Sequence, residues 1–269
     1  MLLAMGKGYG RTDARQPGRR VAPPRYARSV KVTQELETRM HPDSVAGFRL
    51  VLAEARVTDT ILLPVRAMER MVTPAQWMLR RVGAHGIRLT QAGYLPPAVV
   101  VEASTQLDWG WPGTASRESH FLPLLELRAH LRSVGLLRVS KGMLLQTSRG
   151  RALAEAPREL WWYLARTVHQ SRDPAETDAV RLLLLLIARR GFDESELFKQ
   201  LLALSLETVG WVRADGAPLS GDAAFDLVLP KWRLLRRLGV FDTGLYGYSR
   251  WIVTPGGAAF ARAALQSEA

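Results

Sequence analysis

Residues 131–150, which read LRSVGLLRVSKGMLLQTSRG, carry the pattern that sets the fold. An apolar helical pattern ends at Gly135, where a glycine can take the left-handed conformation that commonly closes a helix. Apolar residues then return on both sides of a Ser-Lys-Gly turn, which predicts strands at 136–139 and 143–146. Thr147 follows as the expected N-cap of another helix. The stretch therefore predicts a helix, a β-hairpin and a capped helix in succession.

The same pattern occurs three times, so this segment belongs to an internal repeat. Each copy pairs a helix-ending glycine with a later Thr-x-x-Gly motif: Gly83 with Thr90, Gly135 with Thr147, and Gly239 with Thr254. The spacings from glycine to threonine are 7, 12 and 15 residues. Seven residues are too few for a full hairpin, whereas twelve and fifteen leave room for two strands and a turn. Each threonine is expected to cap the helix that follows it.

A helix, a hairpin and a capped helix are how a winged helix ends. The run from Gly135 to Arg138 and the run from Leu145 to Leu153 resemble the wing of bacterial winged-helix regulators of the multiple-antibiotic-resistance-regulator type. Residues 80–100, taken with that wing, look like a more particular group. These are uncharacterised winged-helix proteins of high-GC bacteria, often found beside a plasmid open-reading-frame-three-like domain. The resemblance implies a fold and no established activity, and the β-rich plasmid-type domain is not evident in this sequence.

The chain is therefore expected to be mainly α, with tandem winged-helix units that carry short β-hairpin wings. The first unit is expected within residues 41–170, preceded by a helical extension that includes the abbreviated copy at Gly83. A polar linker at 170–174 separates it from a second unit over 174–269. Apolar periodicity predicts helices at 121–134, 158–168, 179–190, 194–209 and 222–238. The stretch 212–221 reads as a loop.

The N-terminal region carries half of the net charge of +12, with nine Lys and Arg and three Asp and Glu in residues 1–39. Its Gly, Pro and Arg content predicts a disordered basic tail over 1–40. This tail could be a nucleic-acid-contacting arm or a solvated segment with no specific role. A third hypothesis is a mis-assigned start, with the native product beginning near Met40. Asp43 or Ser44 would then cap the first helix.

Basic residues on the helices and wings are the candidate nucleic-acid contacts. In DNA-binding winged helices the helix before the wing enters the major groove, and the wing touches phosphate or the minor groove. The matching cations are Arg128, Arg132, Arg138, Lys141 and Arg149 in the first unit, and Lys231, Arg233, Arg236, Arg237 and Arg250 in the second. Cations are also favoured in the last turn of any helix, which is the alternative explanation. One exposed positive face made by Arg128, Arg132, Lys141, Arg233 and Arg237 would favour DNA, and its absence would favour protein docking.

Four aromatic residues are candidate partner contacts. Trp109 and Trp111 lie in a loop rich in Gly and Pro, and Tyr246 and Tyr248 would sit at the tip of the second wing. Such rings can stack on bases or fill a groove of a partner. The alternative is that the tryptophan loop folds back onto its own core.

Several function classes find no support. Without cysteine there is no disulfide framework and no thiol chemistry, and the five histidines lack metal-ligand spacing. Phosphate-loop and Gly-x-Ser-x-Gly motifs are absent. The longest apolar run, 182–188, is far shorter than the roughly 20 residues of a membrane span. We therefore expect a cytoplasmic, non-enzymatic winged-helix protein that binds DNA, with no cofactor, metal or membrane partner. A regulator is one such role. The alternatives are a protein–protein scaffold and an enzyme of unrecognised class.

Overall fold

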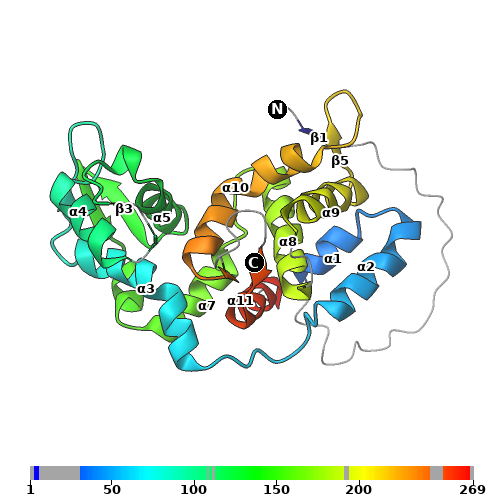
Figure 1. Cartoon of the computed structure of the whole chain (residues 1–269), viewed down its shortest axis with the longest axis horizontal. Coiled ribbons are helices and arrows are strands. Elements are labelled where there is room, and N and C mark those ends of the chain that lie inside the picture. Colours follow the sequence, from blue (N-terminus) through cyan, green and yellow to red (C-terminus); the bar gives the residue numbers. More distant parts are fainter. Residues whose placement is uncertain are drawn as a thin grey trace.

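The structure is a computed structural model that describes residues 3–5, 31–107, 109–110, 113–190, 194–242 and 251–266. As predicted, the protein is mainly α-helical with small antiparallel sheets (Figure 1). The α-helices are α1 (Lys31–Glu37), α2 (Pro42–Glu54), α3 (Val65–Val82), α4 (Pro97–Gln106), α5 (Leu122–Ser133), α6 (Ser148–Ala154), α7 (Pro157–Thr167), α8 (Pro174–Arg189), α9 (Ser195–Thr208), α10 (Gly221–Arg237) and α11 (Pro255–Gln266). The strands are β1 (Leu3–Met5), β2 (Ile87–Arg88), β3 (Leu137–Ser140), β4 (Met143–Gln146), β5 (Trp211–Arg213), β6 (Phe241–Asp242) and β7 (Ile252–Val253).

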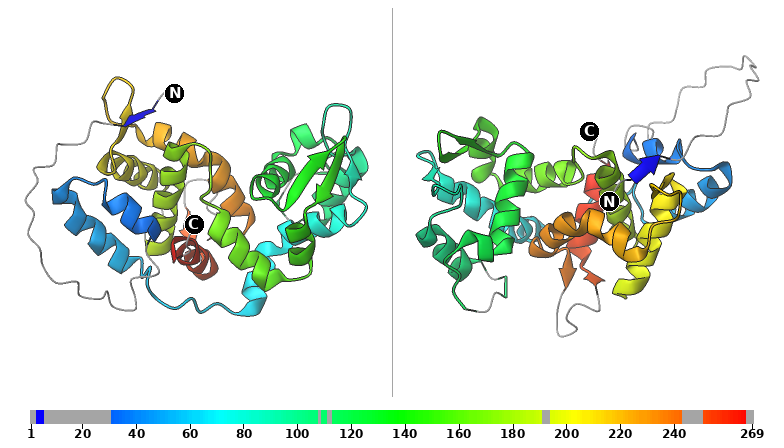
Figure 2. Two further views of the ribbon diagram at one scale, coloured as in Figure 1. Left: turned by 180° about the vertical axis from the view of Figure 1, so that it is seen from behind. Right: turned by 90° about the horizontal axis from the view of Figure 1, so that it is seen from above.

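The elements form two lobes joined at α3 and α7 (Figures 1 and 2). We call α3 to α7 the first unit and α8 to α11 the second unit. Helix α2 packs against α8 and belongs with the second unit, so the predicted segment of 41–170, the extension together with the first unit, begins too early. The reason is burial, because Phe48 on α2 is buried on the side that packs against α8, where it lines a cavity with leucines of α8 and α9. The chain then crosses from one lobe to the other between α2 and α3.

The first unit combines its helices with a three-stranded sheet. The strand order is β2-β4-β3, with Ile87 opposite Leu144 and Leu137 opposite Gln146. The repeat copy at Gly83 is thus the first helix and first strand of this unit, and the expectation of a separate extension is wrong. Seven residues are too few for a hairpin, but they suffice for one strand that pairs with β4.

The second unit repeats this order with fewer strands. Helices α8, α9 and α10 precede the pair β6–β7, and α11 follows. Strand β5 pairs with β1, with Leu3 opposite Arg213, and does not join β6–β7. The stretch 212–221 is therefore not entirely a loop, because Val212 and Arg213 lie in β5.

The predicted threonine cap is present in the first unit. Thr147 Oγ1 accepts a hydrogen bond from the N–H of Gly150 at 3.0 Å, and the same hydroxyl donates to the carbonyl of Gly135 at 2.7 Å. Gly135 has a φ of 72°, the left-handed conformation expected of a helix-ending glycine. One side chain therefore ties the end of α5 to the start of α6.

The second unit repeats these bonds. Thr254 Oγ1 accepts from the N–H of Gly257 at 2.9 Å and donates to the carbonyl of Gly239 at 2.9 Å. The abbreviated copy differs, because Thr90 Oγ1 accepts from the N–H of Tyr94 at 3.0 Å within a turn and caps no described helix. The cap prediction is confirmed for two copies and wrong for the third.

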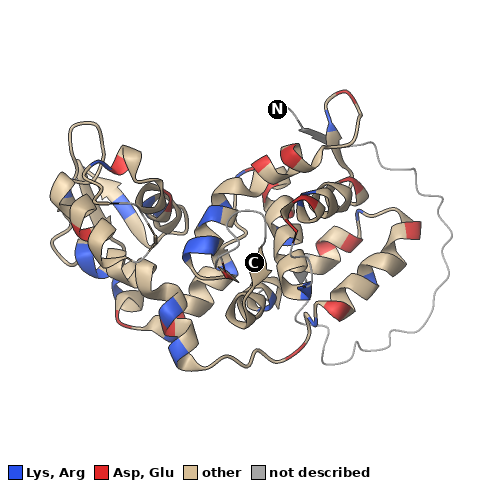
Figure 3. Cartoon of the chain, in the orientation of Figure 1, with Lys and Arg blue, Asp and Glu red and all other residues tan. Residues whose placement is uncertain are grey.

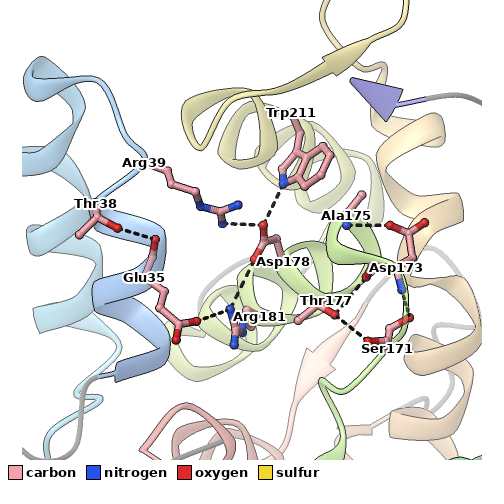
Figure 4. Close-up of polar contacts among 10 residues, drawn as sticks. All are labelled: Glu35, Thr38, Arg39, Ser171, Asp173, Ala175, Thr177, Asp178, Arg181 and Trp211. Carbon is pink, nitrogen blue, oxygen red and sulfur yellow. Dashed lines mark hydrogen bonds and ion pairs between the residues drawn. The ribbon is translucent and has the colours of Figure 1, made fainter. Parts of the chain in front are cut away.

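Helix α1 is held to the second unit by a buried carboxylate, Asp178 of α8 (Figure 4). Asp178 accepts hydrogen bonds from Arg39 Nη2 at 2.5 Å and from Trp211 Nε1 at 2.9 Å. Arg181 Nη1 lies 3.5 Å from Asp178 Oδ1 and 2.9 Å from Glu35 Oε2. The segment before Met40 thus contributes two charged residues to this network.

The expected tail of 1–40 is not uniform. Residues 6–30 lie outside the described residues, whereas Leu3–Met5 form β1 and Lys31–Glu37 form α1. Leu36 is fully buried. A chain that began near Met40 would lack this side chain and two partners of the Asp178 network. Helix α2 is capped by His41, whose Nδ1 accepts from the N–H of Asp43 at 3.4 Å, and not by the two predicted residues.

Candidate nucleic-acid interface

Of the two units, only the first carries an excess of positive charge. Residues 65–167 contain 14 Lys and Arg and 7 Asp and Glu, whereas residues 168–269 contain 12 of each kind. The second unit is therefore electrically balanced, and the excess belongs to the first (Figure 3). This asymmetry favours the first unit as the part that would meet an anionic partner.

Several acidic residues of the first unit are paired with arginines away from the hairpin. Glu155 lies 2.8 Å from Arg80, Glu102 lies 2.6 Å from Arg81, and Glu126 lies 3.0 Å from an arginine of α10. The Glu155 carboxyl pKa is lowered, chiefly by its hydrogen bond from Arg80. None of these three pairs involves a cation of the hairpin. Within the described residues, the exposed cations beside the hairpin that make no ion pair are Arg88, Arg132, Arg138, Lys141 and Arg149.

Two of these arginines share one face of the small sheet. Arg88 pairs in register with Met143, and Arg138 pairs with Leu145, so all four side chains lie opposite the buried Leu144. Both arginines are exposed, and the two apolar side chains between them are half-buried. We call this surface, together with Lys141 at the turn, the hairpin face. Sequence reasoning missed Arg88 because the strand that carries it was assigned to a separate extension.

Lys141 sits at the tip of the hairpin. Its φ of 50° and the 73° of Gly142 are the two positive values that a tight two-residue hairpin turn requires. The side chain of Lys141 is exposed. Arg132 is exposed in the last turn of α5, so it lies beside the start of the hairpin.

Arg149 leans onto α7. Its Nη1 donates to the hydroxyl of Tyr163 at 3.2 Å, and its guanidinium lies 5.3 Å from the centre of that ring. The Tyr163 hydroxyl in turn donates to the carbonyl of Val134. Arg149 is thus held in place near the hairpin, with its remaining N–H groups available at the surface.

Arg128 is not a surface residue, so its assignment as a nucleic-acid contact is wrong. Its guanidinium donates two hydrogen bonds to the Glu118 carboxylate, from Nε to Oε1 at 2.6 Å and from Nη2 to Oε2 at 2.9 Å. The side chains of Arg128 and Glu118 are 7% and 0% exposed. Glu118 also accepts from the N–H of Leu95 at 2.7 Å. This pair ties α5 to the loop before α4, and Glu118, ten residues earlier, is the partner that sequence reasoning did not assign.

Lys231 of the second unit is half-buried at the contact with the first unit. Its Nζ lies 3.3 Å from His130 Nδ1 and 3.4 Å from the carbonyl of Gln170. Burial lowers the pKa of Lys231 to about 8, against the opposing effect of Glu176. Burial also lowers the pKa of His130 well below its usual value. These groups form part of the contact between the two units.

Arg233 and Arg237 of α10 face the first unit. Arg233 Nη1 lies 3.0 Å from Glu126 Oε1, and Arg237 Nη1 donates to the carbonyl of Trp109 at 3.0 Å. Arg236 packs its guanidinium 4.8 Å from the centre of the Trp232 ring. The five cations that were expected to make one exposed positive face therefore do not make one. Arg250 lies outside the described residues.

Helix α5 itself lies against α10, and Figure 1 shows the two helices facing each other between the lobes. In a DNA-binding winged helix the equivalent of α5 enters the major groove. The contact with α10 covers one side of α5 along Glu126 and His130. The hairpin face is one exposed basic surface of the first unit, and further exposed arginines lie on α3, α6 and α7.

Trp109 packs against the core of the first unit. The Trp109 ring is half-buried and lies 5.7 Å from Phe121, a fully buried core residue, which favours the alternative that this residue packs on its own core. Its indole covers core surface that would otherwise meet water. Trp111, Tyr246 and Tyr248 lie outside the described residues.

Metal-ligating side chains do not gather anywhere in the described part of the chain. Across the same residues, no helix combines the length and the apolar character that a membrane crossing requires.

Comparison with known proteins identifies a related domain family for the first unit. Residues 67–159 match the model of the Y4jL N-terminal domain family. The matched range runs from α3 to the start of α7 and so coincides with the first unit. No curated protein and no solved structure matches the chain significantly. The match supports the limits of the first unit and brings no activity with it.

Proposed function

We propose that the chain is a non-enzymatic winged-helix protein that binds duplex DNA through the hairpin face of its first unit. The order α3-β2-α4-α5-β3-β4 supports the winged-helix assignment, because β2 pairs with the second strand of the hairpin, as in that fold. The wing would be of the multiple-antibiotic-resistance-regulator type that uncharacterised proteins of high-GC bacteria carry. A regulatory role in the cytoplasm follows as an expectation.

The proposal rests mainly on the cations of the hairpin. Among the described residues, none of these cations has a carboxylate partner. Arg88, Arg138 and Lys141 surround one small surface, and Arg132 adds a fourth charge beside it. Exposed guanidinium and ammonium groups in this arrangement can each neutralise a backbone phosphate. Because α10 covers one side of α5, the proposed contact is with the DNA backbone and not with base edges in the major groove.

The test measures the affinity of the full chain for a short duplex over a series of salt concentrations. For the double variant Arg138→Ala/Lys141→Ala, the slope of log affinity against log salt should fall by about 2, one phosphate contact for each cation. The matched control is Arg158→Ala/Arg166→Ala, which removes the same charge from exposed positions on α7. Equal losses in both double variants would contradict the proposal, as would a full chain that binds no duplex at low salt.

Protein docking is the second candidate. It is favoured by the absence of the one exposed positive face expected from Arg128, Arg132, Lys141, Arg233 and Arg237, and by the apolar side chains on the same hairpin. Met143 and Leu145 are half-buried between the arginines of the hairpin face. An acidic protein surface with an apolar centre would fit them. A full chain that binds no duplex at low salt, yet is correctly folded, would favour this candidate.

A further inference from the structure

A cavity of about 300 Å³ lies in the second unit, where α2 and α9 both pack against α8. Each of the three helices turns one face to it, because its lining positions recur at i, i+3, i+4 and i+7. These positions begin at Ser44 on α2, at Leu182 on α8 and at Leu201 on α9. The wall that each helix provides therefore extends over two turns, about 10 Å along its axis. We call this space the second-unit cavity.

The second-unit cavity has an aliphatic floor. Leu182, Leu185 and Leu186 of α8 line it and are each at most 5% exposed. At the rim, Leu204 of α9 is 60% exposed, so a large apolar side chain meets water there. Phe48 is the one aromatic ring among the described lining residues. A ligand in this space would therefore meet mainly methyl and methylene groups.

Among the described lining residues, no unpaired charge faces the second-unit cavity. Arg189 is the one charged residue in this lining, and it forms an ion pair with Glu54 of α2. The hydroxyls of Ser205 and Thr208 donate to carbonyls of their own helix at 2.7 Å and 2.8 Å. Ser44, the remaining polar side chain, is uncharged. These contacts favour a neutral ligand over an ionic one, because a buried charge needs a partner.

Gly47 leaves part of this space open. It lies inside α2, where glycine is less favourable than alanine because it loses more conformational freedom on folding. A Cβ at this position would meet no atom of the described residues within 4 Å, so close packing does not require a glycine. The backbone is helical there and does not require one either. A longer side chain at Gly47 would instead occupy the cavity that this residue lines.

We propose that the second-unit cavity binds a neutral small molecule with an unbranched alkyl chain. The volume lies at the lower end of the range of small-molecule sites. Walls two turns long and lined by aliphatic side chains match a chain of methylene groups, each of which gains free energy on leaving water. An aromatic ligand would find one ring to stack on, and a charged group would find no unpaired partner in the described lining. A helix from a partner protein, about 10–12 Å across with its side chains, is too wide for this volume.

The experiment measures how straight-chain primary alcohols, from butanol to dodecanol, displace the neutral dye N-phenyl-1-naphthylamine from the full chain. Because each buried methylene contributes a similar free energy, affinity should rise about fourfold with each added carbon. The increase should stop at the chain length that fills the cavity. Decanoate should bind more weakly than decanol, because its carboxylate would lose water without gaining an unpaired cation.

Gly47→Leu is the decisive variant. It places an apolar side chain in the cavity and fills the space of several methylene groups, so decanol affinity should fall at least about tenfold. The midpoint of thermal unfolding should not fall, because leucine favours a helix more than glycine does. The matched control is Ala46→Leu, which adds the same side chain at a neighbouring exposed position of α2 that does not line the cavity. This control should bind decanol as the native chain does.

The chain-length limit is measured on the native chain, so it does not depend on the folding of any variant. An affinity that still rises at the same rate from decanol to dodecanol, or equal losses in Gly47→Leu and Ala46→Leu, would overturn the proposal in favour of adsorption to exposed apolar surface. Tighter binding of decanoate than of decanol would overturn the neutral ligand. A dimer in sedimentation equilibrium that Gly47→Leu dissociates, with no alcohol bound, would replace the ligand with a second copy of this chain. Arg138→Ala/Lys141→Ala should leave decanol binding intact, because the hairpin face lies in the other unit.

Discussion

The helices before the two hairpins end in the same sequence motif and lie in different surroundings. In the first unit α5 runs into a hairpin that carries exposed cations, whereas in the second unit α10 turns its cations toward the other lobe. The loop chemistry is nonetheless the same, with Thr147 and Thr254 making equivalent pairs of bonds. The repeated motif therefore determines the backbone conformation of the loop. The role of each side chain depends on the residues that pack around it.

Aligning Gly135 with Gly239 sets Arg128 opposite Trp232. Both side chains are buried, one in an ion pair with Glu118 and the other in an aromatic cluster. The position is an inward-facing one in both helices, whatever residue occupies it. A charged residue near a helix end can therefore belong to the core.

The largest effect should follow from breaking the buried pair of the first unit. Arg128→Met leaves Glu118 buried without its guanidinium, which should lower the free energy of unfolding by about 3–5 kcal/mol. Urea denaturation measures this loss. The control Arg132→Met, at an exposed position one turn later, should change the free energy by no more than about 0.5 kcal/mol. A small effect of Arg128→Met on the free energy of unfolding would contradict the burial of Arg128 in an ion pair with Glu118.

The next effect tests whether the two units are built alike. A Cβ at Gly150 would lie 2.1 Å from the carbonyl oxygen of Leu136, and one at Gly257 would lie 2.2 Å from that of Val240. Both Gly150→Ala and Gly257→Ala should therefore destabilise the protein by about 2–3 kcal/mol. Thermal unfolding of the two variants gives the comparison.

Gly47→Ala is the control for these substitutions. Gly47 lies inside α2, and a Cβ there would meet no atom of the described residues within 4 Å. This change should leave stability unchanged or raise it by up to about 1 kcal/mol. A loss in only one of the two units would show that their loops are not equivalent.

Low pH should lower the folding stability through His169, which lies between α7 and α8 at the junction of the two units. Burial, with a further contribution from the charges of Arg181 and Lys231, lowers the pKa of His169 to about 4. The unfolded chain takes up this proton near pH 6.5, and the folded one only near pH 4. Folding stability should therefore fall as the pH drops from about 6.5 to 4, by about 2 kcal/mol at pH 5.

Urea denaturation at pH 7 and pH 5 measures this difference for the native chain and for His169→Gln. The variant should lose about that amount of acid sensitivity. His85→Gln, at an exposed histidine, should keep the acid sensitivity of the native chain. An unchanged pH profile for His169→Gln would refute the assignment.

The smallest effect concerns the threonine caps. Thr147→Ala and Thr254→Ala each remove one hydrogen bond to a helix N-terminus and one to a helix-ending glycine. Each should cost about 1 kcal/mol, with similar values in the two units. Thr90→Ala, which caps no described helix, should cost less. Chemical denaturation resolves the ranking, and a larger cost at Thr90 would contradict it.

Most helices, the first hairpin and the threonine-capped loops could be predicted from the chain alone. These features depend on residues within a few positions of one another, such as Gly135 and Thr147, whose backbone preferences and hydrogen bonds are local. Which cations are exposed depended instead on the packing of distant elements. Arg128 is buried with Glu118, and Arg233 pairs with Glu126, which is 107 positions away in the chain. The exposure of a side chain depends on which distant element packs over it, and the local sequence pattern does not contain that information.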